Sequence, residues 1–245
     1  MPESLDFCTS RRLPLSDRAR HNGDMASELI IFDCDGVLID SELIACRENA
    51  ACLTEIGFPI AVDEIAEQYV GISATAMFAD LETKFGISVP PGFAEKVRLQ
   101  LMSRFNSELI AMPGIEAALS AIKSPVCVAS SSAPERLQHT LSLVGLFNRF
   151  NPHIFSATQV RRGKPAPDLF LFAARQMGVE PRTCLVVEDS VAGVRAAVDA
   201  GMQVIGFTGG SHCRPGHSER LRQAGAADIV NDFEDFLELS AVRNS

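Results

Sequence analysis

The amino-acid sequence predicts an α/β fold: a doubly wound, Rossmann-like parallel sheet with a small helical cap domain inserted after the first strand. From Met112 onward, short apolar segments alternate with amphipathic ones, as in a parallel sheet whose two faces are covered by helices. Residues 42–108 show helical periodicity and few strand-like segments. We therefore expect residues 28–41 and 109–245 to form the core and residues 42–108 to form the cap.

The composition argues against nucleic-acid and membrane partners and indicates that the cysteines are reduced. The chain of 245 residues carries a formal net charge of -9, whereas a general nucleic-acid binder needs a basic surface. No apolar stretch approaches the roughly 20 residues of a membrane span, so we expect no membrane partner. The seven cysteines form no CxxC pair, which is typical of reduced thiols in a cytoplasmic protein.

Residues 1–27 differ from the rest of the chain. Four arginines lie there among serine, proline and acidic residues, and apolar periodicity is weak. The segment lacks the apolar central run of a secretory signal, and its acids are unusual for a transit peptide. We interpret it as a disordered tail, with Met25 as an alternative natural start.

The core and cap elements follow in order along the chain. Leu29–Phe32 is an apolar run that ends in acids and glycine, which indicates a buried strand leading into a loop. Apolar residues then recur at helical spacing from position 43, with further helical runs after position 62 and between positions 93 and 105. The remaining apolar runs predict strands at 126–129, 154–156, 184–187 and 204–207, with a short closing strand near Ile229. Amphipathic segments predict helices at 115–123, 134–144, 167–177 and 191–200.

Two carboxylates follow the first predicted strand, in the pattern Asp33-x-Asp35-Gly36. Side chains two residues apart on an extended segment point to the same side. The pair can therefore serve one site, although an acidic turn at the end of a strand would have the same pattern. A calcium loop of the EF-hand type would require further ligands and a closing glutamate, which are absent.

Ser130, Ser131 and Ser132 follow the second predicted strand. Hydroxyls and free backbone N–H groups at such a place make an anion site. The alternative is a helix cap, with Ser132 positioned to cap the helix that begins near Pro134. Lys164 lies in a turn stiffened by two prolines and can neutralise a phosphoryl oxygen or a carboxylate, although a loop lysine is ordinarily solvated.

Glu188 and Asp189 follow a strand rich in β-branched residues and precede a helix. Carboxylates in this place are ligands that Mg²⁺ prefers. Asp189 or Ser190 would equally serve as a helix N-cap. Each of the four segments is ambiguous alone, but in this order, each at a strand end, they provide two acids, a hydroxyl, a cation and a metal ligand.

With these residues in view, the sequence resembles the haloacid dehalogenase superfamily. The resemblance covers residues 28–240 and rests on DCDGVLIDS (33–41), VASSS (128–132), GKPAPD (163–168) and VVEDS (186–190). Within the superfamily, the chain is similar to the β-phosphoglucomutase-like branch with a helical cap. The FDCDG, FNSEL (105–109), PVCVASSS (125–132) and VVEDSVAG (186–193) segments look like those of bacterial 6-phosphogluconate phosphatases.

The resemblance implies a Mg²⁺-dependent phosphatase that acts on a small phosphorylated metabolite. Asp33 would be the nucleophile and Asp35 the general acid and base. Ser130 would bind a phosphoryl oxygen, and Lys164 would hold charge. The residues expected to bind Mg²⁺ are Asp33, the carbonyl of Asp35, Glu188 and Asp189. Those expected to contact substrate are Gly36, Ser131 and Arg162, with Arg161 and Arg47 as further candidates.

Two departures from the branch bear on the reaction. Its mutases typically carry a histidine and an arginine at positions that correspond to Ala45 and Ala74 here. The absence of both side chains favours a hydrolase over a sugar-phosphate mutase, and the mutase remains the alternative. A third possibility is a binding protein with the same fold and no catalytic activity. A response-regulator receiver is disfavoured because its domain is much shorter and its acceptor aspartate does not follow the first strand.

Overall fold

The computed structural model describes residues 27–243, with side chains up to residue 239. Its centre is a six-stranded sheet in the order β3-β2-β1-β4-β5-β6, in which every neighbouring pair is parallel. The strands are β1 (Leu29–Phe32), β2 (Val126–Ser130), β3 (Ile154–Ser156), β4 (Cys184–Glu188), β5 (Gln203–Phe207) and β6 (Asp228–Val230). The predicted parallel sheet is confirmed.

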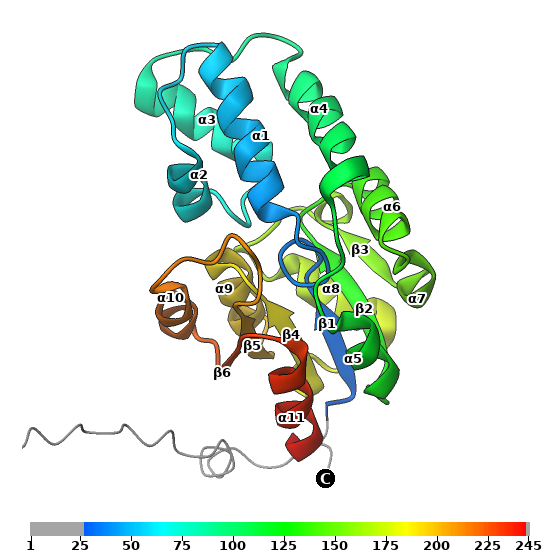
Figure 1. Cartoon of the computed structure of the whole chain (residues 1–245). Coiled ribbons are helices and arrows are strands. Elements are labelled where there is room, and N and C mark those ends of the chain that lie inside the picture. The colour runs from blue at the N-terminus through cyan, green and yellow to red at the C-terminus, as the bar shows by residue number, and fades with distance from the viewer. Residues whose placement is uncertain (1–26, 244–245) are drawn as a thin grey trace, which may run out of the picture.

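Helices cover both faces of this sheet (Figure 1). The side chains of β1 alternate between two apolar clusters, because successive residues of a strand point to opposite faces. Ile30 and Phe32 belong to one cluster, and Leu29 and Ile31 to the other. The first cluster draws on α5 (Ile115–Ala121), α6 (Pro134–Leu143), α7 (Phe147–Phe150) and α11 (Phe233–Arg243). The second draws on α8 (Asp168–Met177), α9 (Val191–Asp199) and α10 (His217–Ala224).

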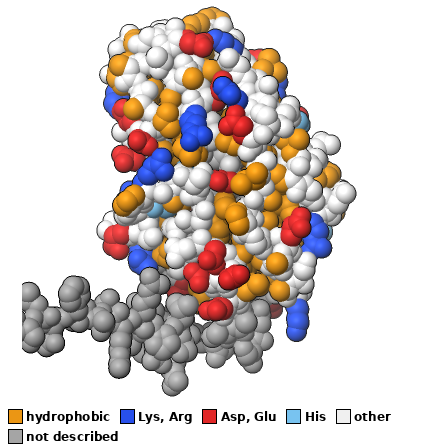
Figure 2. Space-filling view, viewed as in Figure 1, with side chains coloured by type: hydrophobic (Ala, Val, Ile, Leu, Met, Phe, Trp, Pro, Cys, Tyr) orange, Lys and Arg blue, Asp and Glu red, His pale blue; other side chains and the backbone are white. Residues whose placement is uncertain are grey.

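Four helices between β1 and α5 form a separate block above the carboxyl ends of the strands (Figure 1). They are α1 (Glu42–Glu55), α2 (Val62–Gln68), α3 (Ala74–Phe85) and α4 (Phe93–Glu108). The block has its own apolar cluster, which includes Leu53, Phe58 and Phe78. It therefore packs largely on itself. Figure 2 shows acidic and basic side chains intermixed on the visible face of both the block and the sheet layer.

The two chain segments that join the block to the sheet lie side by side. Ile39 and Ala111 form an antiparallel bridge. The amide of Asp40 donates to the carbonyl of Ile110 at 3.1 Å, and the amide of Met112 donates to the carbonyl of Leu38 at 2.9 Å. The outgoing and returning segments are thus tied together at the base of the block.

The structure corrects several predicted boundaries. β2 and β4 each extend one residue further than predicted, so that Ser130 and Glu188 are the last residues of their strands. α5 ends at Ala121 rather than 123, because Ile122 is already extended. The short α7 and the helices α10 and α11 were not predicted. α7 has only four residues, and α10 contains few apolar residues.

Two predictions concern segments or features outside the sheet. The predicted tail, residues 1–27, lies outside the described residues except for its last position. In the part of the chain that the structure describes, no helix combines the length and apolarity required to cross a membrane.

Candidate active site

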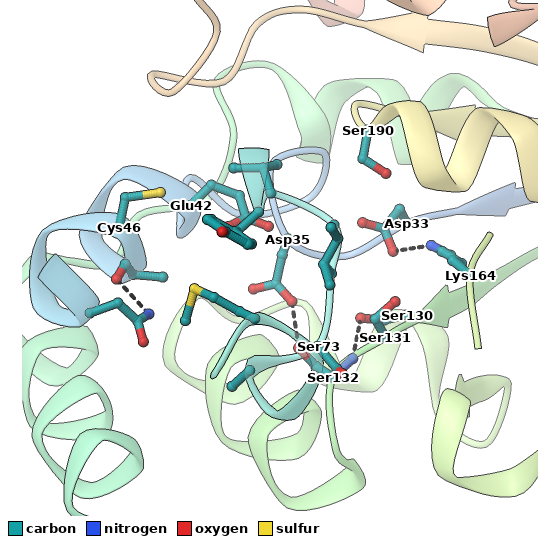
Figure 3. A pocket seen from close by; sticks show the side chains of 18 of the residues that line it. Asp33, Asp35, Glu42, Cys46, Ser73, Ser130, Ser131, Ser132, Lys164 and Ser190 are labelled. Carbon is teal, nitrogen blue, oxygen red and sulfur yellow. Dashed lines mark hydrogen bonds and ion pairs between the residues drawn. The ribbon is translucent and has the colours of Figure 1, made fainter. Parts of the chain in front are cut away.

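A cavity of about 130 Å³ lies between the carboxyl edge of the sheet and the helical block. The sheet layer supplies most of its charged and hydroxyl groups, and α1, α3 and the segment between α2 and α3 supply the opposite wall (Figure 3). The residues contributed by the sheet layer are Asp33, Asp35, Ser130, Ser131, Ser132, Arg136, Lys164, Glu188 and Ser190. The strand register explains this convergence, because Phe32 pairs with both Val128 and Val187, so that all three strands end at one edge.

Lys164 joins the two acidic segments of the site. Its Nζ donates to Asp33 Oδ1 at 2.7 Å, to Glu188 Oε1 at 2.7 Å and to the carbonyl of Ala129 at 3.0 Å. The lysine side chain is only 1% exposed. Burial alone would lower its pKa, but the adjacent carboxylates of Asp33 and Glu188 outweigh burial and raise it. Lys164 is therefore a charged residue whose ammonium group is hydrogen-bonded to buried protein acceptors, and not a solvated loop residue.

Asp35 is held by three donors. Ser41 Oγ and Ser132 Oγ each donate at 2.6 Å, and Arg136 Nη2 donates at 2.7 Å. Burial would raise the pKa of Asp35, but Arg136 and the two hydroxyls outweigh it and lower the pKa. The side chain is thus kept ionised in this state.

This arrangement changes the interpretation of Ser132. The residue that caps α6 is Ala133, which makes no side-chain cap bond. The hydroxyl of Ser132 faces Asp35 instead, so its role as a helix cap was a wrong alternative. At α9 the capping alternative holds, because Ser190 Oγ accepts from the amide of Gly193 at 3.0 Å.

Asp33, Glu188 and Asp189 bring carboxylate oxygens within 4.8 Å of one another. Burial first, and then neighbouring carboxylates, raise the pKa of Asp33 and of Asp189, with Lys164 acting in the opposite direction. Asp189 Oδ2 is buried without a hydrogen-bond partner, although His212 Nε2 lies 3.0 Å away. An all-oxygen set with excess negative charge and an unpartnered buried oxygen fits a hard divalent cation such as Mg²⁺.

The oxygens of Glu188 are already occupied by protein donors. Oε1 accepts from Lys164, and Oε2 accepts from the amide and the hydroxyl of Ser190 at 2.7 Å and 2.9 Å. Glu188 is therefore suited to fix Lys164 and the start of α9. Asp33 and Asp189 are the carboxylates better placed to hold a metal.

Gly36 lies directly beside this acid cluster. Its φ is +79°, and a Cβ at this position would overlap Asp189 Oδ2. Gly36 thus leaves room for the Asp189 carboxylate, although neither residue is among those that line the cavity.

Arg162 is the predicted site residue that the structure does not bring to the cavity. Its guanidinium pairs with Asp168 at 2.7 Å and its side chain is 66% exposed. Ser130 and Ser131 do line the cavity, and Ser130 Oγ accepts from the amide of Ser132 at 3.1 Å. Arg162 thus pairs with Asp168 on the outer surface and does not line the cavity, and its contact with substrate stays a prediction.

Sequence reasoning missed several polar residues of the cavity, among them Glu42, Asn49 and Arg136. Arg136 lies in the first turn of α6, just after the serine run, but its local sequence carries no signal that it reaches the site. Burial, with Asp35 and Asp189 nearby, raises the pKa of Glu42 to about 8. The wall opposite Lys164 therefore carries a carboxyl group rather than a cation (Figure 3).

A profile of the haloacid dehalogenase-like hydrolase family matches residues 28–201. The chain belongs to this family. A relative from Escherichia coli, 6-phosphogluconate phosphatase, is 34% identical over 189 residues, which are 77% of this chain and 86% of the relative. The family resemblance and the similarity to 6-phosphogluconate phosphatases are both confirmed.

Two solved structures share the fold over most of the chain. A conserved member of unknown function from Agrobacterium tumefaciens has a TM-score of 0.79 and 41% identity, covering 89% of this chain and 99% of that chain. A candidate β-phosphoglucomutase from Thermotoga maritima has a TM-score of 0.68 and 26% identity, covering 88% and 99%. A hydrolase family together with a phosphatase relative at this identity places the chain in the phosphatase class of enzymes.

Proposed function

We propose that the protein is a Mg²⁺-dependent phosphatase that hydrolyses a small phosphorylated metabolite through an aspartyl-phosphate intermediate on Asp33. The observation that carries this proposal is the position of the Asp33 carboxylate, which lies in the cavity, hydrogen-bonded to buried Lys164 and with carboxylate oxygens of Glu188 and Asp189 within 4.8 Å. A carboxylate attacks phosphorus efficiently only where the phosphoryl charge is neutralised, and this site concentrates the groups for doing so.

In the first step, a carboxylate oxygen of Asp33 forms a bond to phosphorus while the bond from phosphorus to the ester oxygen breaks. Asp35 gives its proton to the departing oxygen, which leaves as an alcohol. Mg²⁺, held by Asp33, Asp189 and the carbonyl of Asp35, would neutralise phosphoryl charge. Because Arg136 keeps Asp35 ionised in this structure, the proposal requires that this contact loosen when substrate binds.

In the second step, Asp35 takes a proton from water, and the water oxygen attacks the phosphorus of the aspartyl phosphate. The bond to Asp33 breaks, inorganic phosphate leaves and the Asp33 carboxylate is restored. The lowered pKa of Asp35 supports this half of the cycle, because a base must be ionised before it acts. The hydroxyl of Ser130 and the ammonium of Lys164 would bind phosphoryl oxygens throughout.

Hydrolysis is favoured over the mutase reaction by the wall of the cavity. Ala45 and Ala74 line it at the two positions where mutases of the branch typically carry histidine and arginine. A mutase must retain and reorient a bisphosphate, and alanines offer no contact for a second phosphate. Incubation with β-glucose 1-phosphate and a bisphosphate primer tests this choice, since isomerised product without net phosphate release would support the mutase.

The decisive test is phosphate release from p-nitrophenyl phosphate with Mg²⁺ and with EDTA. We expect turnover only with Mg²⁺, and a loss of at least about 10³-fold in Asp33→Asn, which removes the nucleophile. Asp199→Asn, at an exposed carboxylate of α9 outside the cavity, is the matched control and retains activity. No release by the wild-type protein across p-nitrophenyl phosphate and a panel of phosphorylated sugars would favour the idle binding protein instead.

A further inference from the structure

The charge balance of the cavity restricts the substrate. Among the described residues that line it, four are carboxylic acids, Asp33, Asp35, Glu42 and Glu188, and two are cations. Both cations are engaged: Lys164 with Asp33 and Glu188, and Arg136 with Asp35. A bound divalent cation would offset this excess of acids, but the phosphoryl group of the substrate would then add negative charge. No lining cation is left for a second anionic group on the substrate.

The wall that faces away from Lys164 is uncharged apart from Glu42. It consists of residues of the helical block that are small, apolar or bear a neutral polar group, namely Ala45, Cys46, Asn49, Ile65, Tyr69, Val70, Gly71, Ile72, Ser73, Ala74 and Met77. A carboxylate at the far end of a sugar chain would meet this wall and the Glu42 carboxyl. Burying an unpaired carboxylate there is costly, whereas a hydroxyl needs only a hydrogen-bond partner.

Asn49 on α1 provides that partner. Its Nδ2 donates to the carbonyl of Ala45 at 2.8 Å, and this bond orients the amide, because a carbonyl oxygen can only accept. Its Oδ1 is consequently an acceptor, and it is buried without a hydrogen-bond partner. The phenol of Tyr69, another polar group of the wall, is already engaged with Asp80 at 2.6 Å. An unpartnered acceptor in a substrate cavity is satisfied by a group that donates a hydrogen bond.

We propose that the substrate is the phosphate ester of an uncharged sugar or polyol, one of whose hydroxyls donates to Asn49 Oδ1, and that sugar-acid phosphates are poor substrates. This inference rests on the phosphatase function proposed above and narrows its substrate class. It also separates this protein from its Escherichia coli relative, whose name specifies a sugar-acid phosphate.

The test compares sorbitol 6-phosphate with 6-phosphogluconate, which differ only at the carbon farthest from the phosphate. We expect the wild-type kcat/KM to be at least about tenfold higher for sorbitol 6-phosphate, because a buried site rejects an unpaired charge. In Asn49→Leu, we expect kcat/KM for sorbitol 6-phosphate to fall about tenfold more than that for p-nitrophenyl phosphate, which has no hydroxyl to donate. Asn106→Leu, at an exposed asparagine of the same helical block outside the cavity, is the matched control and leaves the ratio unchanged.

The outcomes distinguish the two levels of the proposal. Turnover of p-nitrophenyl phosphate with equal or better hydrolysis of 6-phosphogluconate overturns the substrate inference and leaves the phosphatase function intact. Absence of Mg²⁺-dependent turnover of every substrate overturns both. The comparison of substrates uses wild-type protein, so it stands even where Asn49→Leu does not fold. Where that variant folds, an unchanged preference for sorbitol 6-phosphate overturns the role of Asn49.

Discussion

Lys164 and Arg162 are two residues apart in one loop, but their ion pairs differ in burial. Lys164 is 1% exposed and bonded to two carboxylates, whereas Arg162 is 66% exposed and paired with Asp168. Removing one partner of a buried ion pair leaves an uncompensated charge in a poorly solvated place, while an exposed pair is screened by water. The contribution of these two cations to stability should therefore differ strongly.

We expect Lys164→Met to lower the free energy of unfolding by about 3 kcal/mol at neutral pH, because Asp33 and Glu188 lose their counter-charge. Arg162→Met should cause no measurable change. Urea unfolding of both variants in EDTA measures the difference. Similar losses in the two variants would contradict the buried, charge-neutralising role of Lys164.

Glu42 makes the stability of the metal-free protein depend on pH. Its pKa is raised to about 8 in the folded protein, above the ordinary 4.5, mainly by burial. Between these two values the folded chain holds a proton that the unfolded chain has released, so the stabilisation from this group is present at low pH and lost as pH rises toward 8. We expect Glu42→Gln to gain stability relative to the wild type as pH rises. The difference in their free energies of unfolding should grow by about 2 kcal/mol from pH 5 to pH 9, a magnitude reduced to allow for partial exposure of the Glu42 side chain. Denaturant unfolding across this range in EDTA measures it, and a flat difference would refute the shift.

The site residues that could be predicted from the sequence lie mostly at strand ends, whereas those that could not be predicted reach the site mostly from helices. Asp33, Ser130 and Glu188 end or directly follow apolar strands, and parallel strands end at one edge, so local patterns predict that they meet. Arg136 reaches Asp35 across 101 positions of sequence. Such a contact depends on how α6 packs on the sheet and on which way a long side chain turns, and neither has a local signature.

At the scale of elements, α9 begins against the acid that ends β4. Gly193 lies inside this helix, where alanine ordinarily stabilises by roughly 1 kcal/mol. Here a Cβ would overlap Glu188 Oε1, the oxygen that binds Lys164. The helix and the strand are therefore packed too closely at this point for any side chain.

We expect Gly193→Ala to destabilise the protein by about 2 kcal/mol instead of stabilising it, because the carboxylate of Glu188 must shift. Phosphatase activity should fall by about tenfold, since Lys164 moves with its partner. Thermal unfolding and phosphate-release assays measure the two effects. Val198→Ala, on the exposed side of the same helix, is the control and should change stability by less than about 0.5 kcal/mol.

Elements were predicted well where apolar residues are dense and poorly where they are sparse. β1 and the buried strands beside it were located to within one residue. α10 was missed because its eight residues, HSERLRQA, are mostly polar and only His217 and Leu221 are buried. A helix held by so few apolar contacts has no periodic pattern to detect.

At the scale of the whole molecule, metal binding should appear as added thermal stability. A ligand that binds only the folded state stabilises it by about 2.7 kcal/mol at a concentration of 100 times its Kd. We expect Mg²⁺ to raise the Tm of the wild-type protein, and to have no effect on Asp189→Asn, which loses the unpartnered carboxylate oxygen. Asp199→Asn, at an exposed acid of α9, should keep the wild-type increase. Scanning calorimetry with Mg²⁺ and with EDTA measures it, and an equal increase in Asp189→Asn would refute the assigned ligand.

The antiparallel pairing at the base of the helical block has a consequence for how the chain accommodates change. Residues 38–40 and 110–112 are hydrogen-bonded to each other, so the segment between them is an insertion whose two ends are fixed side by side. The entropy cost of closing such an insertion grows only slowly with its length. Residues can thus be added, removed or exchanged between these two ends without disturbing the strand register. The same reacting groups at the edge of the sheet can therefore be combined with different substrate-recognition surfaces.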